Sequence, residues 1–304
     1  MVKSQFPDEQ GEDGSFQRQE DAFRAWVSQN PSDPHPLAPG RYHLYVSLAC
    51  PWAHRTVLFR SFLGLEKVVG MTVVDPVRDD RGWAFRDGDG FSTDPVEGFA
   101  FLAEAYHLTD PSYKGRYTVP VLWDKVTRRI VNNSEDDLCL MMQKVFCAGN
   151  PPHDFFPDNL REEQSYWADL VYQKINNGVY QAGFATSQEK YQEAVKALFS
   201  ALDQVEDQLN KGPYLLGETL TEVDWRLFCT LIRFDAVYVG HFKCNLRRIV
   251  DYPNLQSYLR RLLDFPGARS TIRMDHIKDH YYRTHHELNP SGIVPLGPIL
   301  EWEQ

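Results

Sequence analysis

Short apolar segments in the first half of the chain predict a small sheet flanked by helices. Four segments rich in β-branched, aromatic or leucine residues predict strands: Arg41–Leu48, Val68–Val74, Val119–Trp123 and Arg129–Val131. Helical spacing of apolar residues follows the first strand, over Ala53–Leu63, and the last, over Leu138–Phe146. A strand, a helix and a strand in succession predict a parallel, right-handed βαβ unit.

A βαβ unit followed by a hairpin and a helix is the order of elements in the thioredoxin fold. This order is interrupted by Asp75–Asp110, which is rich in glycine, aspartate and arginine around Trp83. A segment of that length is too long for an ordinary connection. We therefore expect a functional or covering insertion.

Apolar spacing in the second half of the chain predicts helices. From Tyr191 onward the apolar residues recur in steps of three and four along one helix face, at Val195, Leu198, Leu202, Val205 and Leu209. Thr186-x-x-Glu189 predicts a capping box at the start of that helix. Thr221-x-x-Asp224 predicts a second box, with aspartate in place of the usual glutamate or glutamine.

These patterns divide the chain into four parts. Residues 1–39 are polar and rich in proline, glycine and acidic residues, which predicts an extended arm with one short helix around Asp21–Val27. Residues 40–149 form a thioredoxin-like domain, and residues 150–264 form a helical domain. Residues 265–304 hold many proline, glycine, tyrosine and histidine residues, and we expect them to be an extension that packs on the helical domain.

Composition and charge exclude several classes of protein. The 304 residues are 42% hydrophobic and 24% charged, which is typical of a globular chain that needs no disulfide or metal to form a core. The net charge of −10 argues against a nucleic-acid-binding protein. No apolar run approaches the roughly 20 residues that span a bilayer, and the N-terminus lacks a secretory signal. We therefore expect a cytoplasmic protein without nucleic-acid or membrane partners.

The cysteines are odd in number and form no CxxC pair; they are Cys50, Cys139, Cys147, Cys229 and Cys244. This pattern predicts neither a disulfide framework nor a zinc site, and we expect no metal. Cys50 lies between a predicted strand and a predicted helix, in Ala-Cys-Pro-Trp-Ala. The start of a helix stabilises a thiolate and lowers the pKa of the thiol. A buried structural cysteine is the alternative interpretation.

Ala53 stands where a dithiol oxidoreductase has its second cysteine. A disulfide formed by Cys50 must therefore be resolved by an outside thiol, and glutathione is the abundant one in the cytosol. Val119-Pro120 opens a strand where thioredoxin-like proteins carry a cis-proline. A cis bond would turn the Val119 backbone toward Cys50, ready to pair with an extended thiol peptide, and an ordinary trans proline is the alternative.

Five colinear segments resemble the glutathionyl-hydroquinone reductases, the Xi class of glutathione transferases: Arg41–Arg55, Gly115–Asp124, Asn176–Glu189, Arg233–Cys244 and Asp275–Pro298. The resemblance implies an α/β thioredoxin-like N-terminal domain, an all-α glutathione-transferase C-terminal domain and a homodimer. It also implies that glutathione reduces glutathionyl-hydroquinones to hydroquinones. The reaction would proceed through a Cys50–glutathione mixed disulfide and release glutathione disulfide.

The resemblance assigns roles to residues at matching positions. Cys50 is the nucleophile, and glutathione is contacted by Trp83, Arg116 and the backbone of Val119. Tyrosines line the hydroquinone pocket, at Tyr180, Tyr238 and Tyr281. Tyr180 or Tyr281 would supply or position the proton that the reduction needs. Packing is the alternative for each tyrosine, and a core anchor is the alternative for Trp83.

The chain departs from this family where the γ-glutamyl end of glutathione is held. The family has Asn-Glu-Ser there, and this chain has Asn-Asn-Ser-Glu-Asp-Asp over residues 132–137. Without a gap, Ser134 replaces the glutamate and Glu135 the serine; with a slip of one residue, Asn133 and Ser134 serve instead. Both registers stay open. We expect Ser134 to cap the following helix, and at least two of the three acids to face solvent.

Two other functions fit the same residues. An Omega-like thioltransferase or dehydroascorbate reductase would use the same Cys50 chemistry on small disulfides. A non-catalytic ligand-binding protein would keep the fold and bind glutathione weakly, because Glu135–Asp137 would repel its carboxylates.

Overall fold

The computed structural model describes residues 7–147 and 150–303, and the chain divides into two compact units. The sheet unit comprises Gln19–Asp154 and Pro266–His280. The helical unit comprises Met1–Arg18, Phe155–Phe265 and Tyr281–Gln304. Residue 149, at one predicted domain boundary, lies outside the described residues.

The strands of the sheet unit that are described form one sheet in the order β2–β1–β3–β4, with β1 (Tyr42–Val46), β2 (Gly70–Val73), β3 (Val121–Asp124) and β4 (Arg129–Asn132). β1 and β2 are parallel, whereas β1–β3 and β3–β4 are antiparallel. The two central strands are buried along their whole length, and both are apolar except for His43 and Asp124. The predicted thioredoxin-like order is confirmed.

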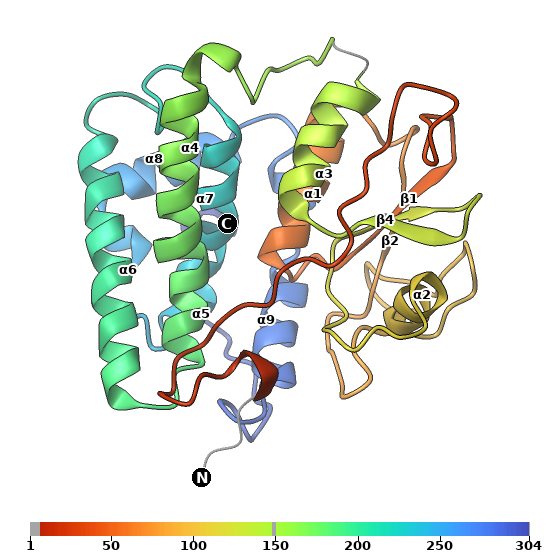
Figure 1. Ribbon diagram of the computed structural model, residues 1–304. Helices are drawn as coiled ribbons and strands as arrows, with labels where there is room; N and C mark the ends of the chain where they lie inside the picture. The colour runs from red at the N-terminus through yellow and green to blue at the C-terminus, as the bar shows by residue number, and fades with distance from the viewer. Residues whose placement is uncertain (1–6, 148–149, 304) are drawn as a thin grey trace. The chain divides into compact units, whose positions relative to one another are not determined.

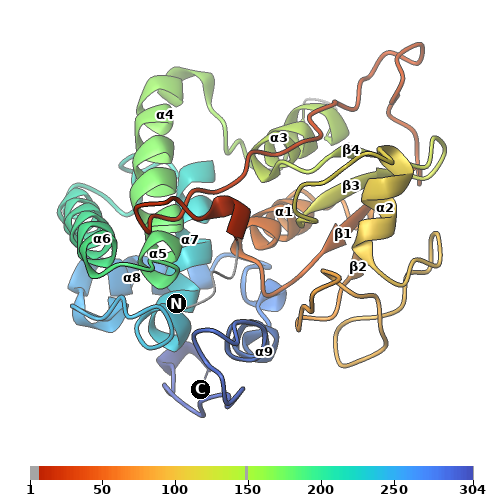
Figure 2. The ribbon, with the colours of Figure 1, turned by 60° about the horizontal axis from the view of Figure 1, so that its bottom comes forward.

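Helices cover both faces of this sheet. Figure 2 shows α1 (Pro51–Phe62) and α3 (Glu135–Met141) on one face and α2 (Leu102–Thr109) on the other. α3 continues as a π-helical turn over Met142–Phe146, so the predicted second helix begins three residues earlier than its apolar pattern. α2 lies inside the predicted insertion, Asp75–Asp110, where no helix was predicted because its apolar pattern is short.

The N-terminal arm pairs with the outer strand of the sheet. The amide of Ala25 donates to the carbonyl of Val131 at 3.1 Å, and the amide of Asn133 donates to the carbonyl of Phe23 at 3.0 Å. The predicted helix around Asp21–Val27 is therefore wrong. Extended backbone at this place covers the edge of β4 and satisfies backbone groups on both segments.

The helical unit is built from α4 (Arg161–Leu170), α5 (Asn177–Gly183), α6 (Gln188–Gln208), α7 (Glu222–Arg233) and α8 (Pro253–Leu263) (Figure 1). A π-helical turn, Val171–Asn176, joins α4 to α5. α9 (Met274–Thr284) crosses the division between the units, and its residues from Tyr281 onward belong to the helical unit. The apolar face predicted for α6 is buried, from Val195 to Leu209.

One of the two predicted capping boxes is confirmed. At the start of α7 the amide of Thr221 donates to a carboxylate oxygen of Asp224 at 2.8 Å. The box predicted at Thr186 is wrong, because Ser187 caps α6 by accepting from the amide of Lys190 at 3.3 Å. Thr186 is bound to the arm instead, through its amide and the carbonyl of Gly14 at 3.1 Å. No helix described in either unit has the length and apolar character needed to cross a membrane.

Candidate active site

Cys50 occupies the N-cap position of α1. Its carbonyl accepts the first hydrogen bond of the helix, from the amide of His54 at 2.9 Å. The half-buried thiol therefore lies at the positive end of the helix dipole, where a thiolate is stabilised. Its Sγ donates to the carbonyl oxygen of Val119 at 3.6 Å. The thiol and the backbone of Val119 are thus neighbours, as expected for a thioredoxin-like site.

The Val119–Pro120 bond is cis, and hydrogen bonds fix the residue that precedes it. The hydroxyl of Tyr106 donates to the carbonyl of Thr118 at 2.9 Å and accepts from its amide at 3.1 Å. Burial raises the pKa of Tyr106 well above its ordinary value, so this tyrosine stays a neutral phenol. The Val119 backbone is therefore held beside the thiol by a buried polar contact.

The side chain of Asn133 belongs to the same buried network. Its Nδ2 donates to Oγ1 of Thr118 at 3.1 Å and to the hydroxyl of Tyr106 at 3.3 Å, while its Oδ1 accepts from the amide of Phe23 at 2.8 Å. Asn133 therefore joins the arm, α2 and the segment before Val119. These bonds commit Asn133 to structure, which favours the register that uses Ser134 and Glu135.

Ser134 and Glu135 lie where β4 gives way to α3, and both are buried. Ser134 takes the N-cap position of α3, but its side chain makes no capping hydrogen bond, contrary to our expectation. The carboxylate of Glu135 lies 3.3 Å from Nη2 of Arg55, a buried residue of α1. Arg55 also pairs with Asp136.

The expectation that two of the three acids face solvent is wrong. Asp136 is exposed, but Glu135 is buried and the side chain of Asp137 is only 13% exposed. Asp137 pairs with Arg24 of the arm. The reason for the error is that arginines from α1 and the arm, rather than water, compensate this acidic run.

Trp83 and Arg116 are held by contacts within the sheet unit. The Trp83 ring is 5% exposed, stacks on His280 with centroids 5.0 Å apart, and lies 5.9 Å from the guanidinium of Arg78. The backbone amide of Arg116 donates to the side chain of Gln19 at 3.0 Å.

The predicted tyrosines form one cluster inside the helical unit. The hydroxyls of Tyr180 and Tyr281 are 2.5 Å apart, and those of Tyr281 and Tyr238 are 2.9 Å apart. Tyr281 and Tyr238 are fully buried, whereas Tyr180 is 8% exposed. Burial raises the pKa of Tyr238 and Tyr281 well above their ordinary values, so both remain protonated. The three hydroxyls thus form a line, and Tyr180 is its outer end. We call Tyr180, Tyr281 and Tyr238 the tyrosine cluster.

Comparison with known proteins matches both halves of the chain. The family model for the N-terminal domain of glutathione S-transferases matches residues 49–143, and that for the C-terminal domain matches residues 188–261. Glutathionyl-hydroquinone reductase PcpF of Sphingobium chlorophenolicum is 44% identical over 94% of this chain and 90% of its own length. The chain belongs to the Xi class of glutathione transferases, the glutathionyl-hydroquinone reductases.

Solved structures of this class share the fold closely. A Xi glutathione transferase from Phanerochaete chrysosporium superposes with a TM-score of 0.92, at 44% identity and 95% coverage of both chains. The glutathione-bound structure of YqjG, a glutathione transferase homologue from Escherichia coli, superposes with a TM-score of 0.88, at 43% identity. It covers 93% of this Xi-class chain and 94% of its own.

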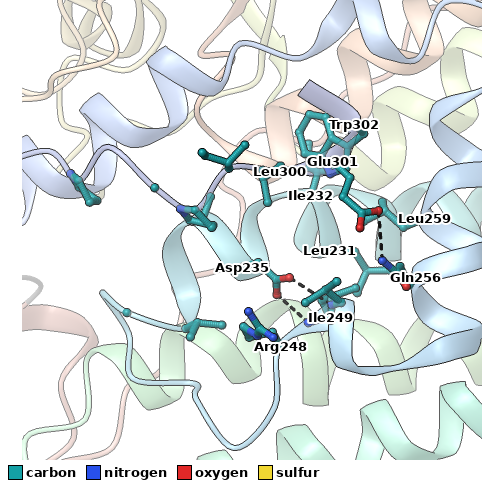
Figure 3. A pocket seen from close by; sticks show the side chains of 18 of the residues that line it. Leu231, Ile232, Asp235, Arg248, Ile249, Gln256, Leu259, Leu300, Glu301 and Trp302 are labelled. Carbon is teal, nitrogen blue, oxygen red and sulfur yellow. Dashed lines mark hydrogen bonds between the residues drawn. The ribbon is translucent and has the colours of Figure 1, made fainter. Parts of the chain in front are cut away.

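A separate cavity of about 480 Å³ lies in the helical unit of this Xi-class chain (Figure 3). Its wall comes from α7, α8 and the C-terminal segment, with Ile232, Leu259 and Leu300 among the apolar residues. At its edge the carboxylate of Asp235 accepts from the amides of Ile249 and Val250. The residues that line this cavity do not include any of the predicted site residues.

Sequence reasoning missed the arginines of the site. Arg55 carries the compensation of Glu135, and Arg78 contacts the ring of Trp83. Arg18 of the arm lies over Tyr180. Arg55 stands inside the segment that carries the Cys50 motif, so a signal for it existed. The ring partner of Arg18 is distant in sequence, whereas Arg78 and Trp83 lie in the same predicted insertion.

Proposed function

We propose that this Xi-class chain reduces glutathionyl-hydroquinones to hydroquinones at the expense of glutathione, with Cys50 as the nucleophile. The observation that carries the proposal is the single thiol at the start of α1, beside the carbonyl of Val119 and with Ala53 in place of a resolving cysteine. The name and high identity of PcpF support the same reaction. Thiol and phenol groups suffice for it, with glutathione as the cosubstrate.

In the first step the Cys50 thiolate attacks the sulfur of the glutathionyl-hydroquinone. The bond between sulfur and the aryl carbon breaks, and its electron pair passes to that carbon, which takes a proton from Tyr180 or Tyr281. The hydroquinone leaves, and Cys50 holds glutathione as a mixed disulfide. A glutathione thiolate then attacks this disulfide, releases glutathione disulfide and restores Cys50, while its proton reprotonates the tyrosine.

The same proposal assigns the glutathione contacts. The backbone of Val119 pairs with the glutathione backbone as an added strand, and Trp83 and Arg116 contact the tripeptide. Ser134 and Glu135 hold the γ-glutamyl end, which the structural commitment of Asn133 supports. Glu135 takes the ammonium group, since it is a buried carboxylate with one neighbouring cation, and Ser134 takes the carboxylate. Tyr238 completes the hydroquinone pocket with the other two tyrosines.

We further propose a cytoplasmic homodimer. Three large apolar side chains of the C-terminal segment are exposed, Ile293 by 70%, Leu296 by 99% and Ile299 by 79%. Apolar side chains gathered in one exposed segment are typical of an interface. Reduced glutathione, which the proposed reaction consumes, is abundant in the cytosol.

Glutathionyl-menadione with excess glutathione tests the proposed reaction. With the conjugate kept in its hydroquinone form, we expect the wild-type chain to release menadiol and glutathione disulfide in equal amounts, and Cys50→Ala to release neither. Cys139→Ala is the matched control, because Cys139 is buried in α3 and outside the proposed chemistry. Turnover that survives in Cys50→Ala would overturn the role of Cys50.

An Omega-like thioltransferase is the second candidate, because the half-buried thiol of Cys50 could also attack a small disulfide. Rates on the mixed disulfide of hydroxyethanethiol and glutathione, set against rates on glutathionyl-menadione, separate the two. A higher kcat/KM on the mixed disulfide would favour the thioltransferase. Failure to bind glutathione at all would favour the non-catalytic alternative that the acids Glu135–Asp137 suggest.

A further inference from the structure

The N-terminal arm brings a cation onto the tyrosine cluster. The guanidinium carbon of Arg18 lies 4.9 Å from the centroid of the Tyr180 ring. Its Nε donates to Oδ1 of Asn177, the first residue of α5, at 2.9 Å. A guanidinium in this position interacts favourably with the ring. No sequence pattern singles out Arg18.

The arm is anchored on the helical unit just before Arg18. Phe16 is buried against Phe184 with ring centroids 5.5 Å apart, and the carbonyl of Gly14 accepts from the amide of Thr186. Asp13 forms an ion pair with Lys190 of α6 at 3.3 Å. Both ribbon views show the arm beside α5 at this point (Figures 1 and 2). Arg18 is thus placed by its own segment as well as by Asn177.

The groups around Tyr180 differ in what they do for a phenolate. Tyr281 supplies a hydroxyl at 2.5 Å, and Tyr238 supplies one to Tyr281 in turn. These hydroxyls can donate outward along the line, from Tyr238 to Tyr281 and from Tyr281 to the Tyr180 oxygen, when Tyr180 gives up its proton. Arg18 adds a full positive charge close to the ring over which the phenolate charge is spread. Both contributions stabilise the state that follows proton donation more than the state before it.

We propose that Arg18 is a positioning residue of the reductase reaction, which holds Tyr180 in place and stabilises the phenolate that Tyr180 becomes when it protonates the aryl carbon. The inference rests on the proposed function and deepens it, because it selects Tyr180 over Tyr281 as the proton donor. In each turnover Tyr180 passes its proton to the carbon that has gained the electron pair of the broken C–S bond. The proton of the incoming glutathione thiol restores it.

A comparison of two reactions of the same thiol tests Arg18. Reduction of glutathionyl-menadione needs a proton on carbon, whereas exchange between Cys50 and the mixed disulfide of hydroxyethanethiol and glutathione does not. We expect Arg18→Met to lower kcat for glutathionyl-menadione by about tenfold or more, a part of what general acid catalysis contributes. The rate on the mixed disulfide should stay within about twofold of wild type. Arg18→Lys should recover part of the loss, and added guanidinium chloride at millimolar concentration should rescue Arg18→Met.

Arg247→Met is the matched control, because Arg247 places its guanidinium 5.1 Å from the ring of Tyr252 in the same unit, away from the cluster. It should leave both rates unchanged. In a Tyr180→Phe background, Arg18→Met should have no further effect. Equal losses in both reactions would mean that Arg18 only supports the fold and would overturn the inference. Wild-type protein inactive on glutathionyl-menadione would instead overturn the proposed function.

Discussion

At the scale of single residues, Glu135 is the least ordinary group of the proposed glutathione site. Burial, and then the charge of Asp136, raise the pKa of its carboxyl above its ordinary value, against the opposing effect of Arg55. In the absence of ligand this carboxyl therefore holds its proton to a higher pH than an exposed glutamate does. An ammonium group placed beside it favours the carboxylate, so binding of the γ-glutamyl end should expel this proton.

S-Methylglutathione, which has no thiol proton, isolates this effect. Its affinity should rise as pH increases through the range in which Glu135 loses its proton, and binding below that range should release a proton. Glu135→Gln should weaken binding and abolish the release. Titration calorimetry in two buffers of different ionisation enthalpy measures both quantities. Asp79→Asn is the control, because hydrogen bonds with Arg81 lower the pKa of Asp79 to about 2 and keep it charged throughout. Binding without proton release would contradict the role of Glu135.

At the scale of elements, helix caps that depend on neighbouring residues can be predicted from the sequence. Backbone pairing between segments that are distant in the chain cannot. The cap of α7 needs only Thr221 and the residue three positions on, so its prediction is confirmed. The local sequence of residues 23–25 predicts a helix. These residues are extended instead, because they form backbone hydrogen bonds with β4 and the residue after it, more than a hundred residues later. Ser187, not Thr186, caps α6, and Thr186 is bound to the arm through the carbonyl of Gly14.

The candidate site divides along the same line. Cys50 and the proline after Val119 could be identified from local sequence motifs. The tyrosines were identified only through the family resemblance, because no periodicity singles them out. The contact of Arg18 with Tyr180 could not be predicted, since an arginine in a polar segment is ordinarily solvated. Arg55 lies in the segment of the Cys50 motif, but its pairing with Glu135 joins two helices that are distant in sequence.

Asp224 gives the element scale its own prediction. Its buried carboxylate accepts from the amides of Leu215 and Thr221, at 3.0 and 2.8 Å, and from the hydroxyl of Tyr258 at 2.9 Å. Asp224→Ala leaves these buried donors without an acceptor, and we expect the free energy of unfolding to fall by about 3 kcal/mol. Asp251→Ala, which removes an exposed cap from the amide of Arg248, should cost about 0.5 kcal/mol. Urea unfolding followed by circular dichroism compares the two, and equal losses would contradict the argument.

At the scale of the whole molecule, buried titratable groups affect the pH dependence of stability in ways that the net charge of −10 does not show. Burial lowers the pKa of His43 in the sheet unit and of His241 in the helical unit to about 4. Burial raises the pKa of Asp224 in the helical unit to about 6, and it also raises that of Glu135 in the sheet unit. Each unit therefore holds a buried base and a buried acid whose effects on stability oppose each other.

The sign of each effect follows from where the proton is bound. Between pH 4 and 6.5 the unfolded chain binds a proton at His43 and at His241, whereas the folded chain does not. The contribution of these two histidines to stability therefore rises with pH. Over nearly the same range the folded chain binds the proton at Asp224, so that contribution falls as pH rises. In the helical unit the contributions of His241 and Asp224 nearly cancel between pH 4.5 and 6, and burial raises the pKa of Asp235 as well. His241→Gln removes one side of the balance, and the stability of the variant should then fall by about 1 kcal/mol over that interval. Urea midpoints at the two pH values measure the difference, and a slope unchanged from wild type would show that the His241 ring takes up its proton as readily in the folded protein as in the unfolded chain.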